Sequence, residues 1–398
     1  MAQQKMNGLR ARIDYLLKHS AFVYKAYQVI MSGVMRFWGW FLPIDTKLIV
    51  FTAHTRRYND SPRAIYEYMI NHDKYSDYKF VWAVDDPDNT PIPGPAIKIK
   101  SDTVEYFKTT LRANYWITCV NIERGLIYKK KKCKYLNTWH GVALKRIDNV
   151  DARGNDDFSY VDFMCYESDY QKNILKKSFN AKDEHLIPTG LPRNDALYNT
   201  TEEEIFALKK KLNLPLDKKV ILYAPTWRDS NDGGQSYSIR PPMDMRYWQR
   251  ELESQYVILF RMHAYTNKVM GLEYNDFMRD VSEYPSINDL MKVSDILISD
   301  YSACIVDYSI LERPIICFAY DYEEYQRLRG LNIDLEKEMP SGILRNEKEV
   351  ITFIKGMNYS EQCAKSRLFK NKYTYIGGHA TELCVETLFG NEQIAVRS

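Results

Sequence analysis

Residues 295–321 read DILISDYSACIVDYSILERPIICFAYD, and this stretch decides the fold. The short apolar run at its start predicts a buried strand over 295–302. The segment 303–312 has helical spacing, and the apolar run within 313–321 predicts a second strand. Neighbouring parallel strands need a crossover connection, which is usually a helix. The stretch therefore predicts one unit of a parallel sheet.

The same alternation continues on both sides of this stretch, in two cycles. Strands are expected at 47–54, 79–86, 96–100, 115–121, 134–141, at the start of 218–229, and at 256–264. Helices are expected at 62–70, 103–114, 168–179 and 287–294. Alternating strands and helices indicate α/β domains whose parallel sheets are wound on both faces.

The chain has 398 residues, which is too long for one ordinary hydrophobic core. A charged segment over 195–217 resembles a connection between domains. We therefore expect a helical segment over 1–45 and two doubly wound, Rossmann-type domains over 46–205 and 206–398. The two domains are expected to face a cleft, and the last helix is free to pack back on the first domain.

The residues that follow the predicted strands are the candidates for chemistry, because ligands of such sheets bind beyond the carboxyl ends of the strands. Most of these residues are cationic, hydroxyl-bearing or histidine side chains. They are His140, Lys145, Arg193, Asn194, Thr226, Trp227, Arg228, Arg261, His263, Tyr301, Ser302 and Ala303. They include no acidic cluster with metal-ligand spacing, so no metal is expected.

Cations beside a helix start favour an anionic ligand, since arginine and free backbone amides both bind phosphate oxygens. The chain has no GxxxxGK[ST] loop and no GxGxxG after a strand, which disfavours a P-loop NTPase and a dinucleotide oxidoreductase. Net charge is only +3, too weak to indicate nucleic acid binding. A nucleotide diphosphate, held without a cofactor, fits these residues.

Less specific roles compete for several candidates. His140 could be a core imidazole bonded to a backbone carbonyl, and His263 could be structural. His54 is interpreted as structural or peripheral rather than catalytic. Ser302 could simply cap its helix. The seven cysteines lack CxxC spacing, and several lie in apolar runs, which is typical of buried reduced thiols in a cytosolic protein.

The amino-terminal segment is apolar and aromatic over residues 20–43 but is interrupted by Lys25 and Arg36. The uninterrupted part is too short for a membrane-spanning helix. A basic, aromatic, interrupted segment is typical of a helix that lies in the membrane interface. The expected contacts are Arg36, Phe37, Trp38, Trp40 and Phe41. The alternative is a helix packed on the protein's own core.

An ordered set of motifs over roughly residues 47–390 resembles the CDP-glycerol glycerophosphotransferase family, the wall teichoic acid primases and polymerases. The motifs are TWHG (138–141), PTGLPRND (188–195), LYAPTWRD (222–229), RMH (261–263) and ISDYSACIVDYSILERPIICFAYDYEEY (298–325). The sequence departs from the family pattern at Val142-Ala143 and at Ala303, where the family commonly has Thr-Pro and serine.

The resemblance implies a GT-B-like fold and transfer of glycerol phosphate from CDP-glycerol to a polyprenyl-diphosphate-linked disaccharide of N-acetylmannosamine and N-acetylglucosamine, with release of CMP. It implies a peripheral protein at the cytoplasmic face of the membrane of a Gram-positive bacterium. The chain length is similar to that of the primase. Short enzymes that add a second or further unit, another CMP-releasing transferase of capsule synthesis, and an inactive scaffold stay open, as does a homo-oligomer.

On this resemblance, His140 is expected to be the general base on the acceptor side, because imidazole titrates near neutral pH. His263 and Arg261 are expected to bind the diphosphate, together with Ser302 and the amides after it. Thr226, Trp227 and Arg228 are expected to line the same pocket. Asp307 is assigned to a ribose or glycerol hydroxyl, and Arg329 to a phosphate.

Overall fold

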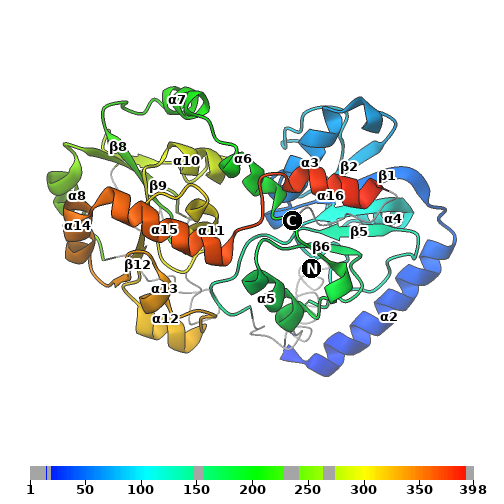
Figure 1. Ribbon diagram of the computed structural model, residues 1–398. Coiled ribbons are helices and arrows are strands. Elements are labelled where there is room, and N and C mark those ends of the chain that lie inside the picture. Colours follow the sequence, from blue (N-terminus) through cyan, green and yellow to red (C-terminus); the bar gives the residue numbers. More distant parts are fainter. Residues whose placement is uncertain (1–14, 16–18, 148–155, 227–241, 263–273, 391–398) are drawn as a thin grey trace, which may run out of the picture. The chain divides into compact units, whose positions relative to one another are not determined.

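The computed structural model describes residues 15, 19–147, 156–226, 242–262 and 274–390 (Figure 1). The chain divides into two compact units. Unit 1 comprises residues 1–140, 147–193 and 379–398, and unit 2 comprises residues 141–146 and 194–378. This division differs from the predicted boundary at 205/206, because the chain passes into unit 2 at residue 194 and a short piece, 141–146, packs there as well.

Unit 1 is built on a parallel sheet with the strand order β3-β2-β1-β4-β5-β6-β7 in the described residues. Its strands are β1 (Asp45–Thr52), β2 (Lys79–Val84), β3 (Ile97–Lys100), β4 (Ala113–Thr118), β5 (Lys134–Asn137), β6 (Phe163–Cys165) and β7 (Leu186–Ile187). The central strands are almost continuously apolar because both faces of the sheet are covered.

Unit 2 repeats the plan with a second parallel sheet, in the order β10-β9-β8-β11-β12-β13. Its strands are β8 (Lys219–Tyr223), β9 (Tyr256–Phe260), β10 (Met278–Asp280), β11 (Ile296–Ser299), β12 (Ile315–Phe318) and β13 (Ile343–Leu344). The stretch quoted first forms β11, helix α11 (Cys304–Ser309) and β12, as predicted. Both sheets have the order of doubly wound domains, with a switch point between β1 and β4 and between β8 and β11.

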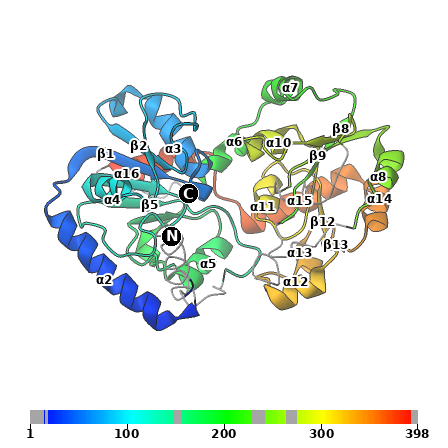
Figure 2. The ribbon, with the colours of Figure 1, turned by 180° about the vertical axis from the view of Figure 1, so that it is seen from behind.

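Helices cover both faces of the sheet in unit 1 (Figures 1 and 2). On one face lie α2 (Ala21–Trp40), α4 (Val104–Arg112) and α5 (Asp169–Phe179). On the other face lie α3 (Asp60–Ile70) and α16 (Ala380–Phe389), of which α16 is made from the end of the chain. The Cys384, Val385 and Leu388 side chains of α16 are buried against the sheet.

In unit 2 the helices of the described residues follow one another from residue 195 to residue 373, and the last two, α14 and α15, are among the longest. These helices are α6 (Asp195–Tyr198), α7 (Glu202–Lys211), α8 (Met245–Leu252), α10 (Ile287–Val293), α11, α12 (Tyr322–Leu328), α13 (Leu335–Glu338), α14 (Glu347–Gly356) and α15 (Tyr359–Tyr373).

Four short 3-10 turns complete the described elements: His54–Arg56, Asp73–Tyr75, Asp183–His185 and Pro192–Asn194.

Helix α2 runs along the outside of unit 1 (Figure 2). Its inner side buries Ser32, Met35 and Gly39, and the partly buried Trp38 packs on the same core. Its outer side exposes a row of apolar residues at helical spacing: Phe22, Val29, Ile30, Val34, Phe37, Trp40 and Phe41. Among the described residues, no helix is both long and apolar enough to cross a membrane.

We predict that α16 contributes to the stability of unit 1. Leu388 has no exposed surface, so Leu388→Ala should lower the free energy of unfolding by about 2–5 kcal/mol. The exposed neighbour Glu386 gives a matched control, for which Glu386→Ala should change stability by less than about 0.5 kcal/mol. Urea unfolding followed by circular dichroism measures both values. Equal stability of the two variants would contradict the placement of α16.

Candidate active site

In unit 1 the candidate site lies at the switch point between β1 and β4. His140 follows β5, and its Nδ1 atom lies 2.7 Å from the carbonyl oxygen of Cys119, the first residue after β4. Trp139 before it has a φ of 54°, and Gly141 after it has a φ of 128°. The imidazole is therefore placed by a turn that ordinary side chains rarely adopt.

The Cys119 carbonyl determines which nitrogen of His140 carries the proton. A carbonyl oxygen only accepts hydrogen bonds, so Nδ1–H must donate and Nε2 is left as the acceptor in the neutral ring. Burial, with a smaller contribution from the neighbouring His54, lowers the pKa of the His140 imidazole from 6.5 to about 4, although the hydrogen bond to the Cys119 carbonyl opposes this shift. His140 is thus a neutral ring at pH 7, with the tautomer that a general base through Nε2 requires.

His54 is a second histidine at the same site, although the sequence favoured a structural role for it. It comes two residues after β1, and its ring centroid lies 5.0 Å from that of His140. Burial lowers the pKa of His54 as well. The signal that could have identified it is its position beyond the end of a predicted parallel strand, the same criterion that selected His140.

Strained backbone gathers in the loops beyond the strands of this sheet. Five of the nine described non-glycine residues with positive φ lie in these loops, namely Thr55, Arg56, Asp102, Arg124 and Trp139, and a sixth, Asp60, begins helix α3. The other three lie at helix ends. Such conformations persist only where the surrounding structure holds them, and they are common at functional sites.

Ion pairs stabilise this edge of unit 1. Asp102 pairs with Arg56 at 3.0 Å and with Arg124 at 2.7 Å, so three strand ends are tied together. Arg193, one of the predicted ligand contacts, pairs at 2.8 Å with Asp60 and is mostly buried. The guanidinium therefore orders the loop beside His54, with which both charges interact.

In unit 2 the corresponding edge is organised by Asp300, directly after β11. Its Oδ1 atom accepts the backbone N–H of Thr226 at 2.8 Å and of Tyr301 at 2.6 Å. Thr226 follows β8, so this carboxylate joins the two strand ends at the switch point. Ser302 is partly exposed there, and its Oγ accepts the Cys304 N–H at 3.3 Å.

Arg261 lies at the end of β9 with its guanidinium fixed by carbonyl oxygens. Its Nη1 atom donates to Tyr284 at 2.6 Å and to Val281 at 3.3 Å. Burial lowers the pKa of Arg261. An arginine has five N–H donors, so this arrangement orients the group while other donors stay available for an anion.

Other predicted residues have different surroundings. The Tyr301 ring is fully buried and stacks on Tyr325 at 3.7 Å, which leaves only its backbone at the strand end. Asp307 is buried and accepts a hydrogen bond from Asn194 at 2.8 Å, so this pair links helix α11 to the start of unit 2. The ligand roles of these residues stay predictions.

The remaining predicted contacts are more scattered. Arg329 is exposed at the end of α12. Lys145 forms a β-bridge with Leu331, so it belongs to unit 2, whereas His140 belongs to unit 1. Ala303 is partly exposed before α11. His263, Trp227 and Arg228 lie outside the described residues.

Two doubly wound sheets, each with polar groups gathered at its switch point, define an α/β protein of the paired Rossmann-type class. A family model, CDP-Glycerol:Poly(glycerophosphate) glycerophosphotransferase, matches residues 34–390. The chain belongs to this family, and the enzyme class expected from the sequence motifs is thereby confirmed.

Several relatives cover most of the chain. The teichoic acid glycerol-phosphate transferase of Staphylococcus aureus is 32% identical and is matched over 96% of this chain and 100% of its own length. The teichoic acid poly(glycerol phosphate) polymerase of Staphylococcus epidermidis is 34% identical over 80% of this chain. The chain spans 47% of that polymerase and 54% of its counterpart in Bacillus subtilis, about half of each.

Solved structures agree with this assignment. The wall teichoic acid polymerase TagF superimposes with a TM-score of 0.78 and 28% identity, covering 94% of this chain and 98% of the TagF chain. The GT-B-like fold expected from the motifs is therefore confirmed. A histidine variant of TagF has also been soaked with CDPG.

We predict that His140 stays neutral well below pH 6 and carries its proton on Nδ1. Its folded pKa lies below 6.5, so its contribution to stability is present above that pH and is lost as pH falls toward about 4. Two-dimensional NMR of protein with ¹⁵N-labelled histidine measures both the pKa and the tautomer. A proton on Nε2, or protonation near pH 6.5, would exclude the geometry described above.

Proposed function

We propose that the chain transfers glycerol phosphate from CDP-glycerol to a hydroxyl of a polyprenyl-diphosphate-linked disaccharide, N-acetylmannosaminyl-N-acetylglucosamine, and releases CMP. Family membership supports the donor and the class of reaction. The observation that carries the proposal is His140: a neutral imidazole, fixed by the Cys119 carbonyl with Nε2 as the proton acceptor, at the switch point of unit 1.

In the proposed mechanism, His140 acts as the general base. Nε2 accepts the proton of the attacking acceptor hydroxyl. At the same time the oxygen of that hydroxyl forms a bond to the phosphorus that bears glycerol. The bond from that phosphorus to the CMP oxygen breaks, and CMP leaves with the electron pair. Transfers of this kind depend mainly on positioning and on stabilisation of charge. The low pKa of His140 keeps the base unprotonated at cellular pH.

Unit 2 is proposed to bind the nucleotide diphosphate of the donor. Arg261, already oriented by two carbonyl oxygens, would supply planar donors to phosphate oxygens. Thr226 and Ser302 lie at the two strand ends that Asp300 joins. His263 and the neighbouring residues Trp227 and Arg228 are assigned to the same site by their motifs. The proposed reaction requires neither a metal ion nor an organic cofactor, which stays a prediction.

The number of units transferred separates two candidates. The primase role, one unit on the lipid-linked disaccharide, is supported by a Bacillus subtilis primase that is 30% identical over 69% of this chain. Addition of a second or further unit is favoured by the matches to the poly(glycerol phosphate) polymerases of Staphylococcus epidermidis and Bacillus subtilis. Mass spectrometry of products made from CDP-glycerol and a synthetic lipid-linked disaccharide tests both.

The same assay tests the catalytic residues. His140→Ala and His263→Ala should each lower the rate of CMP release by at least about a hundredfold, the usual size of acid–base and charge-stabilisation effects. His72→Ala is the control and should leave the rate unchanged. His72 is exposed just after the carboxy-terminal end of α3, whereas the candidate site lies beyond the carboxyl ends of the strands. Full activity of His140→Ala would remove this residue from the mechanism, and absence of CMP release from wild-type protein would exclude the function.

We also propose that the protein lies at the cytoplasmic face of the membrane, with the exposed row of α2 in the interface. Phe37, Trp40 and Phe41, three of the residues expected to contact the membrane, belong to this exposed row, whereas Trp38, also expected there, packs inward. Trp40 is 85% exposed and Phe22 84% exposed, which is unusual for large apolar side chains in water.

The double variant Phe22→Ser/Phe37→Ser should weaken binding to lipid vesicles by at least about tenfold, because each ring loses its burial in the interface. Leu216→Ser/Leu368→Ser is the matched control, since both leucines are also exposed but lie in unit 2. Vesicle flotation measures the bound fraction. Equal loss in the two double variants would place the membrane contact elsewhere.

A further inference from the structure

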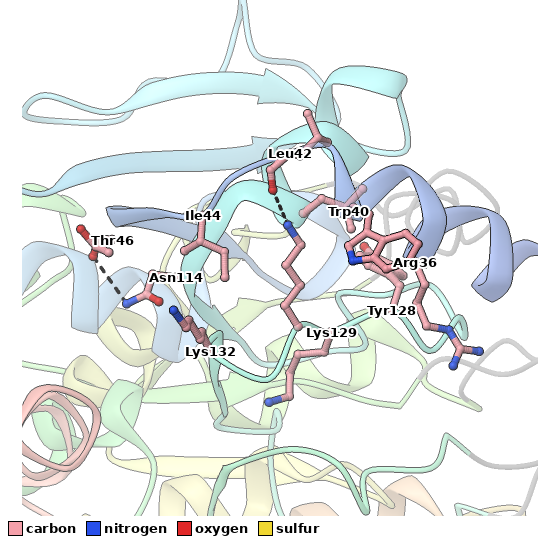
Figure 3. Close-up of a pocket in the computed structure, with 12 residues that line it drawn as sticks. Arg36, Trp40, Leu42, Ile44, Thr46, Asn114, Tyr128, Lys129 and Lys132 are labelled. Atoms are coloured by element: carbon pink, nitrogen blue, oxygen red, sulfur yellow. Dashed lines mark hydrogen bonds between the residues drawn. The ribbon is translucent and has the colours of Figure 1, made fainter.

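A pocket of about 480 Å³ lies beside the carboxy-terminal end of α2, in unit 1 (Figure 3). Helix α2 contributes Arg36, Gly39 and Trp40 to its wall, and the loop before β5 contributes Tyr128, Lys129, Lys130 and Lys132. Leu42, Ile44, Thr46, Leu111 and Asn114 complete the lining.

The charge of this pocket is of one sign. Four cations line it, one arginine and three lysines, and no carboxylate does. Lys129 is compensated from outside the lining, since its Nζ lies 2.7 Å from Asp162 Oδ2. In the described part of the chain, the other three cations form no ion pair. An uncompensated set of cations around a cavity attracts an anion.

The polar atoms of the pocket are arranged to donate hydrogen bonds. Lys130 is partly buried and is held in place by donating from Nζ to the Leu42 carbonyl oxygen, drawn as a dashed line in Figure 3. Burial lowers the pKa of Lys130, so a bound anion would favour its charged form. The exposed Lys132 adds further donors, whereas the Asn114 amide donates to the Thr46 carbonyl oxygen at 3.5 Å (Figure 3). Ammonium and guanidinium groups together suit phosphate oxygens.

The pocket is separate from the candidate active site. Thr46 and Asn114 lie at the amino ends of β1 and β4, and Lys132 precedes β5. His54 and His140 follow the carboxyl ends of these strands. A strand rises about 3.3 Å per residue, so the length of β1 places the two sites on the order of 20 Å apart. The anion in the pocket is therefore a different group from the one that reacts.

The exposed apolar row of α2 leads directly to the pocket. Trp40 belongs to both, because it is the most exposed large ring of that row and also lines the cavity. If α2 lies in a membrane interface, the headgroups of neighbouring lipids reach the same depth as Trp40. The lipid phosphates are then the nearest abundant anions, and they complement the charge of the pocket.

We propose that this pocket binds the phosphodiester headgroup of an anionic phospholipid, with Arg36, Lys130 and Lys132 as the contacts. The proposal rests on the membrane location proposed above and deepens it, because it names one specific lipid contact. In this proposal the amino ends of the strands of unit 1 bind the membrane, and the carboxyl ends carry out the transfer reaction.

The test compares two double variants that remove the same charge. Arg36→Gln/Lys132→Gln removes two cations that line the pocket, and Lys25→Gln/Lys131→Gln removes two from the same helix and the same loop that do not. All four side chains are exposed, so folding should be unaffected. Flotation with phosphatidylcholine vesicles, with and without 30 mol% phosphatidylglycerol, measures the gain in affinity that the anionic lipid provides.

The pocket variant should lose at least about tenfold more of that gain than the control variant, while its binding to pure phosphatidylcholine stays unchanged. Equal losses in both variants would mean that general surface charge attracts the lipid, and the proposal would be overturned. Suppression of wild-type binding by a few millimolar inorganic phosphate would also overturn it, because the pocket would then be a site for the free anion.

A second variant reports on the cavity by itself. Asn114→Asp keeps the shape of the side chain but puts a carboxylate into the wall, so it should abolish the preference for phosphatidylglycerol. An unchanged preference would contradict the proposal. Flotation needs no turnover, so loss of the lipid preference and loss of CMP release are separate outcomes. Likewise, the α2 variant Phe22→Ser/Phe37→Ser should weaken binding to both kinds of vesicle, whereas the pocket variants act only on the anionic one.

Discussion

The structure depends on one constraint of parallel sheets. At the switch point, the two neighbouring strands lead to crossover connections on opposite faces of the sheet. The backbone N–H and C=O groups just beyond these strands therefore have no neighbouring strand with which to form hydrogen bonds. In unit 1 the Cys119 carbonyl is such a group, and it binds His140. In unit 2 the amides of Thr226 and Tyr301 are such groups, and the Asp300 carboxylate accepts them both. Topology thus supplies the acceptors and donors that order each candidate site.

Much of this arrangement could be predicted from the sequence. Apolar runs and helical spacing located most strands of both sheets, but not the short edge strands β10 and β13, and the residues after the predicted strands included His140 and Arg261. Local pattern could not show which side chains meet in space. His54 lies next to His140 only because β1 and β5 flank β4, and the Tyr301 ring is buried because Tyr325 of helix α12 covers it.

The first 45 residues illustrate the same limit at the level of a single helix. Composition indicated an amphipathic segment, but its rotation about the helix axis was decided by small residues. Gly39 allows α2 to approach Leu111 of α4 and Lys130 of the loop before β5, and the Ser32 hydroxyl accepts the Ile127 N–H of the same loop at 2.9 Å. Trp38 consequently faces inward, and Phe37 and Trp40 face outward. A pattern of aromatic residues alone does not distinguish these positions.

The route of the chain through the two units has a consequence for how the protein is made. The chain changes unit after residues 140, 146, 193 and 378, and its last stretch, 379–398, returns to unit 1. Unit 1 therefore lacks the α16 side of its core until residues 380–389 have been synthesised, although its sheet emerges first from the ribosome. The core of unit 1 is completed only after the whole of unit 2 has been made, and no single cut of the chain separates the two units.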